Sequence, residues 1–523
     1  MPKRRRTQTQ VIVIGAGISG LTAAAYLARA GCAVTIYEQA PEIGGVTATL
    51  SQDGYKWDLG PLLLEGFARD ERAGRILRDL GVASRVPLKM DDRTYVFPDF
   101  DLRKPANYPG PQWRRERLGQ LFPSERDGIR AYYRFYNRML DVVTLNVRAD
   151  LARGPWKTLL RLRLWRAFNR VKALQNWSAE KLMNEFFVDA RLKAVFTSIL
   201  ADFVARPSRF PALGVPVLNV ESSFDTRIPR RASLAGQRPS YHYVRGGCGT
   251  LVEAIAAMLR DLGVKLYTGT AVERVLIDAD RMRGVRLATG QTENADVVIA
   301  TGGAQETFLH LVGRQYLPSY LGFQIDELPL MESVFMVQLG VDFDPRPYQP
   351  EALAYYYGTY EIEAAIARCQ RGDYHEGADG FLIYIPSYHS PEMAPDGHHA
   401  LTIYTIAPNE LQEGTWQGRR RELTAKLLAH AEAIIPDLRA HIKTQVVLTP
   451  EDFRSRTHQL HHAFGGCAPL MGHEGLGYDT PIEGLWFIGS QSKSGGGVQN
   501  VMVGARDAAR QILAHARQRR TST

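Results

Sequence analysis

Three glycines and one acid near the N-terminus have the types and the spacing of a dinucleotide-binding turn. The glycines are Gly15, Gly17 and Gly20, and Glu38 follows 18 residues after the last of them. In such a turn the first glycine permits a tight bend, the second lets the backbone approach a pyrophosphate and the third lets a helix pack on a strand. The acid accepts hydrogen bonds from ribose hydroxyls. The predicted contacts of this loop also include Ala16, Ile18 and Ser19.

The predicted elements around this loop follow the order that the motif requires. An apolar run at Val11–Ile14 predicts a buried strand, and small residues from Leu21 to Ala30 predict a helix. A second strand is predicted at Val34–Tyr37, directly before the acid. A phosphate would then lie at the helix N-terminus, where free N–H groups and the helix dipole favour anions. The alternative is an ordinary glycine-rich turn between a strand and a helix.

Further glycine clusters indicate that the dinucleotide is FAD rather than NAD. The pair Gly44-Gly45 comes soon after the acid, and a strand at Gly484–Ile488 leads into another glycine near the C-terminus. Gly495–Gly497 follows, and then a predicted helix at Val503–Ala516. This second helix N-terminus, more than 450 residues from the first, can cover the far end of one long cofactor. The predicted FAD contacts therefore also include Gly44, Gly45, Val46, Gly60, Pro61, Thr301, Gly302, Gly489, Ser490, Gly497 and Val498.

Taken together, these motifs resemble the FAD-dependent family of phytoene desaturases, carotenoid isomerases and retinol saturases. The likeness covers most of the chain and rests on the N-terminal fingerprint, Asp58-x-Gly60-Pro61, Gly246–Leu251, Gly269–Val272, Gly284–Leu287, Ala295-Asp296, Pro386–Gly397 and the C-terminal glycines. The resemblance adds Val272 to the expected FAD contacts. There are two departures: Val46 stands where many members have Arg, and Lys493-Ser494 stands where many have His-Pro.

The resemblance implies an FAD-dependent oxidoreductase that acts on a lipophilic, isoprenoid or carotenoid-like substrate. The expected reaction is desaturation or saturation of a C–C bond by hydride transfer to or from the flavin. A cis–trans isomerase that uses reduced FAD is an alternative, because Pro386–Gly397 is most similar to the isomerase and saturase branch. An amine-oxidase-like flavoenzyme and a non-catalytic flavin-binding protein are further alternatives. No catalytic residue is assigned, because the flavin itself carries the hydride.

Length and composition are those of a soluble globular protein with two or three domains. The chain has 523 residues, of which 45% are hydrophobic and 23% charged. Four scattered cysteines without a C-x-x-C pair predict neither a disulfide framework nor a zinc knuckle. We predict an α/β fold in which a discontinuous, Rossmann-like FAD-binding domain of the GR2 type combines with an α+β substrate domain. The first comprises residues 10–75, 240–310 and 450–523, and the second comprises residues 76–239 and 311–449.

A basic amphipathic helix is predicted at residues 155–175. The chain has no acid between Leu151 and Ala179, but it has seven cations there: Arg153, Lys157, Arg161, Arg163, Arg166, Arg170 and Lys172. Apolar residues fall near helical spacing among them: Trp156, Leu159, Leu160, Leu164, Phe168 and Val171, with Leu162 and Trp165 beside that face. Such a helix suits the surface of an anionic membrane. The alternative is a helix docked on its own protein with a solvated basic back.

The sequence predicts a cytoplasmic location, with peripheral attachment to the inner membrane surface left open. The basic start Met1–Arg6 is followed by an apolar run of only four residues, too short for a signal peptide. No stretch approaches 18 uncharged apolar residues, so no spanning helix is expected. The formal net charge is +9, but no nucleic-acid-binding module accompanies it, and nucleic acid is not an expected partner.

Histidine clusters and tyrosine runs complete the candidate residues. His398 and His399, and the second group His458, His461 and His462, lack the spacing of metal ligands, and no metal site is predicted. One histidine of the second group is a candidate for the substrate cavity. The runs Tyr132–Tyr136 and Tyr355–Tyr357 are interpreted as core residues, with the lining of an apolar tunnel as the alternative.

Overall fold

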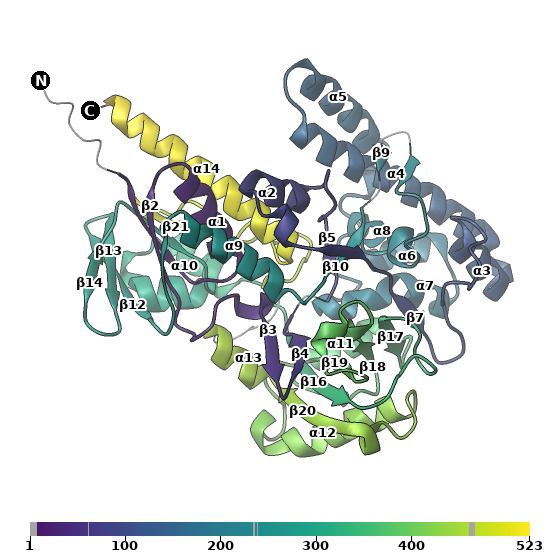
Figure 1. Cartoon of the computed structure of the whole chain (residues 1–523). Helices are drawn as coiled ribbons and strands as arrows, with labels where there is room; N and C mark the ends of the chain where they lie inside the picture. The colour runs from purple at the N-terminus through teal and green to yellow at the C-terminus, as the bar shows by residue number, and fades with distance from the viewer. Residues whose placement is uncertain (1–7, 61, 234–235, 238, 460–465, 523) are drawn as a thin grey trace, which may run out of the picture.

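The computed structural model describes residues 8–60, 62–233, 236–237, 239–459 and 466–522 (Figure 1). Pro61, His461 and His462 lie outside the described residues, so their predicted roles are not placed. Within the described ranges, no helix is both long and apolar enough to cross a membrane.

A five-stranded parallel sheet forms the centre of one half of the molecule. Its order is β11-β2-β1-β15-β21. The strands are β1 (Gln10–Ile14), β2 (Ala33–Tyr37), β11 (Lys265–Tyr267), β15 (Val297–Ala300) and β21 (Leu485–Phe487). The sheet thus combines strands from distant parts of the chain, with β1 at its centre. This arrangement is that of a Rossmann-like sheet and confirms the predicted α/β class.

Both faces of this sheet are buried, because successive side chains alternate between two cores. Val11 and Val13 contact the helices on one face, whereas Ile12 packs on the opposite face. The helices on the first face are α1 (Ile18–Arg29), α2 (Arg72–Leu80), α9 (Gly249–Asp261) and α14 (Val498–Ser522). The other face is covered by the small sheet β12 (Val272–Asp278), β13 (Arg281–Leu287) and β14 (Thr292–Asn294).

The two helices that begin at glycine loops start earlier than the sequence predicts. Helix α1 begins at Ile18 instead of Leu21, directly after Gly17 in an extended conformation. Helix α14 begins at Val498 instead of Val503, directly after Gly497, whose φ is +93°. The polar residues after Gly497 masked this start, because they interrupt the apolar pattern of the helix. Both helix N-termini therefore lie immediately beside the glycines.

A six-stranded mixed sheet forms the centre of the other half. Its order is β20-β16-β19-β18-β17-β7. The strands are β7 (Thr94–Val96), β16 (Ser333–Val341), β17 (Leu353–Tyr357), β18 (Gly380–Tyr384), β19 (His399–Ala407) and β20 (Ile442–Leu448). Helix α12 (Trp416–Glu432) packs on one face through residues such as Leu423 and Leu427. The opposite face carries Met336, Leu382 and Tyr404 in a second core.

Further helices and three small sheets make up the rest of the fold. The helices are α3 (Trp113–Leu121), α4 (Arg126–Leu151), α5 (Pro155–Asn169), α6 (Ala179–Phe186), α7 (Ala190–Thr197), α8 (Val215–Leu218), α10 (Ser319–Asp326), α11 (Ile362–Cys369) and α13 (Pro450–Thr457). The short strands are β3 (Thr49–Gln52), β4 (Tyr55–Asp58), β5 (Leu64–Glu65), β6 (Leu88–Met90), β8 (Arg231–Ser233), β9 (Gly236–Gln237) and β10 (Tyr241–Val244). They form the sheets β5-β10-β6, β3-β4 and β8-β9. Figure 1 shows α4 and α5 as an antiparallel pair on the side away from β12–β14.

The apolar side of the predicted basic helix is divided between two environments. Leu160 packs with Leu145 of α4, and Val171 is buried beyond the end of α5. Trp156 and Leu159 are exposed instead, at 69% and 45% of their surface. Helix α5 is therefore docked on α4 and still presents apolar side chains outward.

Candidate active site

A single cavity of about 1870 Å³ connects the two halves of the molecule. Ordinary small-molecule pockets measure roughly 300–1,000 Å³, so this cavity has room for two ligands. Its lining includes the glycine loops beside the parallel sheet and side chains of the six-stranded sheet. The geometry is that of a site where a long cofactor and a second molecule meet.

Most of the predicted FAD contacts line this cavity. They are Gly15, Gly17, Ile18, Ser19, Glu38, Gly44, Gly45, Val46, Gly60, Val272, Thr301, Gly302, Gly489, Ser490, Gly497 and Val498. Ala16 and Gly20 do not line it. The Ala16 amide donates to Glu38 Oε2 over 2.7 Å, and a Cβ on Gly20 would lie 2.2 Å from the Gly15 carbonyl oxygen. These two residues shape the turn from behind the cavity.

The beginning of α1 has the features of a phosphate site. Gly17 has no neighbouring atom within 4 Å of the place that a Cβ would occupy, so the space beside it belongs to the cavity. Ser19 is 6% exposed, and its hydroxyl has no hydrogen-bond partner among the described residues. No side chain caps the helix. Free N–H groups, an unpaired hydroxyl and open space together fit a dinucleotide pyrophosphate.

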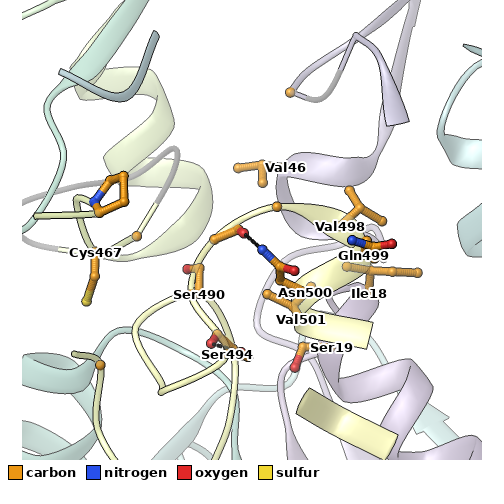
Figure 2. A pocket seen from close by; sticks show the side chains of 18 of the residues that line it. Ile18, Ser19, Val46, Cys467, Ser490, Ser494, Val498, Gln499, Asn500 and Val501 are labelled. Atoms are coloured by element: carbon orange, nitrogen blue, oxygen red, sulfur yellow. Dashed lines mark hydrogen bonds between the residues drawn. The ribbon is translucent and has the colours of Figure 1, made fainter. Parts of the chain in front are cut away.

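A second helix N-terminus reaches the same cavity. Figure 2 shows Ile18 and Ser19, from the start of α1, beside Gln499, Asn500 and Val501, from the start of α14. The Asn500 amide donates to the Gly496 carbonyl over 2.9 Å, which stabilises the glycine loop before the helix. Two positive helix ends therefore converge on one space, as expected where an extended anionic cofactor is bound.

Arg456 is a cation of this site that sequence reasoning did not identify. It lies in α13, lines the cavity and donates from Nε to the Gly45 carbonyl over 3.0 Å. Its guanidinium thus lies next to Val46, the position where the resembling family commonly has Arg. The fold brings this charge from more than 400 residues away, so no local motif contains it. Arg456 can supply the basic phosphate contact that Val46 lacks.

The other end of the cavity has an apolar wall. It contains Val142, Val143, Val147, Leu164, Phe168, Ile199, Phe203 and Phe210. Trp165 lines the cavity as well, yet 60% of its surface is exposed. The cavity therefore borders the protein surface at α5.

Polar side chains also face this apolar end. Asp202 accepts a hydrogen bond from the Tyr355 hydroxyl over 3.0 Å, and burial raises the pKa of its carboxyl to about 6. Burial, and to a lesser degree Glu71, raises the pKa of Glu65 to about 7. Both carboxyls and Tyr355 line the cavity. Sequence reasoning missed Glu65 and Asp202, because each stands alone in its segment and only the fold brings them to the cavity.

The tyrosine runs and the histidines differ in where they lie relative to the cavity. Tyr132 and Tyr136 are buried in the helical core, as predicted, whereas Tyr355 lines the cavity. His458 also lines the cavity, in agreement with the expectation for one histidine of its group. Among the residues that the structure describes, no three His, Cys, Asp or Glu side chains are placed to hold a metal ion.

Comparison with known families identifies the relatives of this chain. A model described as flavin containing amine oxidoreductase matches residues 18–513. The chain belongs to this family. Its members are flavoenzymes, so the cofactor is FAD and the protein is an FAD-dependent oxidoreductase.

Individual proteins of known name resemble the chain over nearly its full length. A zeta-carotene-forming phytoene desaturase of Myxococcus xanthus is 25% identical, covering 95% of this chain and 92% of that protein. Pyridine nucleotide-disulfide oxidoreductase domain-containing protein 2 of Rattus norvegicus is 24% identical, covering 94% and 91%. A structure of putrescine oxidase bound to putrescine covers 97% of this chain and 99% of its own, with a TM-score of 0.61 at 15% identity. The last likeness shows the fold.

Proposed function

We propose that this flavoenzyme desaturates or saturates a C–C bond in an apolar, isoprenoid-like chain. The observation that carries the proposal is the continuity of the cavity from the glycine loops to the wall around Phe168 and Phe210. An extended hydrocarbon fits such a wall, since burying apolar surface is favourable there. The names of relatives that desaturate phytoene and diapophytoene support the same substrate class.

The residues of the cavity have separable tasks in this reaction. Backbone N–H groups at the starts of α1 and α14 hold the pyrophosphate and the far end of the cofactor. When bound, FAD supplies the hydride acceptor or donor. The apolar wall orients the substrate chain and excludes water from the reacting bond.

The number of nucleotide fingerprints indicates which kind of molecule exchanges electrons with the flavin in this redox reaction. Gly15–Gly20 is one complete fingerprint, and FAD occupies it in this proposal. The sequence has no second glycine triplet with a downstream acid that would mark an NAD(P) site. Electrons therefore leave to, or arrive from, a partner such as oxygen or a quinone rather than through stoichiometric nicotinamide.

We infer that the substrate enters from an anionic lipid surface at α5. Trp156, Leu159, Leu162 and Trp165 are all exposed by 45% or more. None of the seven cations between Arg153 and Lys172 forms a salt bridge with a described residue. Cations beside exposed tryptophans suit the headgroup layer, and Trp165 also borders the cavity. A lipophilic substrate would reach the cavity from the membrane without crossing water.

Acceptor consumption tests the proposed function. Purified protein with bound FAD is incubated with candidate polyenes in anionic vesicles, and oxygen or quinone consumption is followed. Bound lipid is extracted from the same preparation and identified by mass spectrometry. The proposal expects consumption that depends on the polyene and isoprenoid lipid in the extract. A protein that consumes no acceptor with any polyene, does not reoxidise its pre-reduced flavin with one and carries no lipid would be a flavin-binding protein without this activity.

A further inference from the structure

Charged groups at the substrate end of the cavity have no task in the transformation of a pure hydrocarbon. They are Glu65, Arg93 and Asp202, and all three line the cavity. Tyr241, Tyr355 and Tyr404 line it beside them. These groups bear on the class of substrate that this end accepts, and an inference drawn from them rests on the proposed function.

The six-stranded sheet places two of these tyrosines on one surface. Tyr355 pairs with Leu382 of the next strand, and Leu382 pairs with Tyr404 beyond it. Residues that are directly opposite on neighbouring strands share one face of a sheet, so both rings point to the cavity side. The Tyr355 hydroxyl is oriented by its hydrogen bond to Asp202 Oδ2. Asp202 itself is partly exposed and lines the cavity.

Glu65 lines the same part of the cavity from the small sheet β5-β10-β6. It is directly opposite Tyr241 in the β5–β10 pair, so the two side chains share a face. No described residue donates a hydrogen bond to the Glu65 carboxyl. The side chain is only partly buried, and it lines the cavity. An acceptor in this position is available to a ligand.

Arg93 is a positive charge behind these acceptors. It is 6% exposed, and its Nε has no hydrogen-bond partner among the described residues. The guanidinium lies 5.4 Å from the ring centre of Tyr95 and 5.6 Å from that of Tyr241. It forms no salt bridge with a described residue. Its charge opposes the rise in the pKa of both Glu65 and Asp202, which favours ionised acceptors near neutral pH.

We propose that Glu65 and Asp202 bind a hydrogen-bond-donating head group, a hydroxyl or an ammonium, on an otherwise apolar substrate. A plain hydrocarbon would remove the last water from both carboxyls and provide no replacement donor, which is unfavourable. A group that only accepts hydrogen bonds, such as an ether, would likewise provide no donor to the two carboxyls. Arg93 supports this site, because its charge favours the ionised form of both carboxyls.

Binding of four matched probes to the FAD-loaded protein tests this proposal. Farnesol, farnesylamine, farnesyl methyl ether and farnesene share one apolar chain, and the shift of the oxidised flavin spectrum reports their binding. We expect the affinity for farnesol or farnesylamine to exceed the affinities for the ether and the hydrocarbon by about tenfold or more, since a hydrogen bond to a charged acceptor contributes at least this much. A preference for farnesol identifies an alcohol, and a preference for farnesylamine identifies an amine.

Variants assign this preference to the two carboxyls. Glu65→Gln and Asp202→Asn should each reduce the preference about tenfold, because a neutral amide accepts a weaker hydrogen bond from the donor probes and costs less to desolvate when farnesene binds. Glu253→Gln is the matched control, because Glu253 is exposed on α9 and pairs with Arg260 away from the cavity. Equal binding of all four probes would overturn the proposal. So would a donor preference that persists in both cavity variants.

The pH dependence of the wild-type protein provides a measurement without substitution. The groups that act on Glu65 are Glu71, Arg72, Arg93 and Tyr241. Those that act on Asp202 are Arg93, Tyr95, Tyr355, Tyr357 and Tyr404. The pKa of Glu65 is about 7 and that of Asp202 about 6, so both carboxyls lose their charge as the pH falls from 8 to 5. Farnesylamine affinity should fall about tenfold or more over this range if the head group is an amine, and farnesol affinity should fall similarly if it is an alcohol, because either probe loses its charged acceptors. A wild-type protein that shows neither profile contradicts the proposal.

The outcomes separate this inference from the proposed function. Donor-dependent binding without a two-hydrogen change in any polyene would remove the proposed function and leave the head-group site. Desaturation of farnesene together with equal binding of all four probes would remove the head-group site and leave the proposed function.

Discussion

The two ends of the cavity are built in different ways. The cofactor end consists mainly of backbone, because Gly17, Gly45 and Gly497 expose N–H groups and leave space for a ligand. The substrate end consists of side chains from α4, α5, β17 and β19. A backbone site needs particular conformations in short consecutive segments, whereas a side-chain site needs only that distant positions come together.

This difference predicts different responses to mutation. At the cofactor end, a single added side chain should exclude the ligand without disturbing the fold. At the substrate end, individual side chains should change affinity and selectivity by smaller steps. Variants at the glycine loops, on α5 and on α13 therefore test the contrast between the two ends.

The largest effect is expected for Gly17→Val. Gly17 has an extended backbone that valine also adopts, and no protein atom lies within 4 Å of the new Cβ. The branched side chain would fill the pyrophosphate space, so we expect FAD affinity to fall about a thousandfold or more, from the loss of two charge-assisted hydrogen bonds. Flavin absorbance of the purified protein and its thermal unfolding measure the two effects separately.

Gly119→Val is the matched control for this variant. Gly119 also has no neighbour within 4 Å of a new Cβ, but it lies in α3 and does not line the cavity. This control should keep its FAD. Full retention of FAD by Gly17→Val would show that the cofactor does not occupy the space beside α1.

A smaller effect is expected at the surface of α5. Replacing Arg161, Arg163, Arg166 and Arg170 by Gln should weaken binding to anionic vesicles by about 4 kcal/mol, at ~1 kcal/mol per cation near the surface. Binding to neutral vesicles should change far less, because only the electrostatic part is removed. Vesicle co-sedimentation at low salt measures both affinities.

A control of equal charge distinguishes α5 from the net charge of the protein. Gln at Arg69, Lys89, Arg117 and Lys265 removes four exposed cations that form no salt bridge with a described residue. This variant should retain most of the affinity for anionic vesicles. Equal losses in both quadruple variants would mean that α5 is not the contact surface.

The smallest effect is expected for Arg456→Gln. Arg456 stands beside the Gly45 backbone, where it can add one charge-assisted contact to a phosphate. We expect a loss of FAD affinity of about threefold to tenfold, the size of roughly 1 kcal/mol. Arg454→Gln, two residues earlier on α13 and outside the cavity lining, controls for disturbance of the helix. If both variants lose FAD equally, Arg456 acts through the helix and not through the cofactor.

The sequence predicts the cofactor end well and the substrate end poorly, for a physical reason. Gly15, Glu38 and Gly497 lie in local motifs whose backbone conformation is itself the binding surface. Glu65 and Asp202 lie in no such motif, because their position at the cavity depends on strand register and on the packing of distant helices. Arg456 was missed for the same reason.

The amphipathic segment shows a second limit of sequence patterns. Its apolar spacing predicts a helix, and α5 is one, but the pattern does not determine which apolar residues are covered. Leu160 is buried against α4, whereas Trp165 is exposed at the border of the cavity. The division of the chain into two discontinuous domains likewise remains a prediction.

Anaerobic mixing of the oxidised holoenzyme with candidate polyenes tests the central claim most directly. The account predicts stoichiometric loss of the oxidised flavin absorbance and a product that is two hydrogens lighter than its substrate. Gly17→Val, which lacks the cofactor, should form no such product. A product of unchanged mass that forms only after the flavin has been reduced beforehand would contradict the account and establish isomerisation instead.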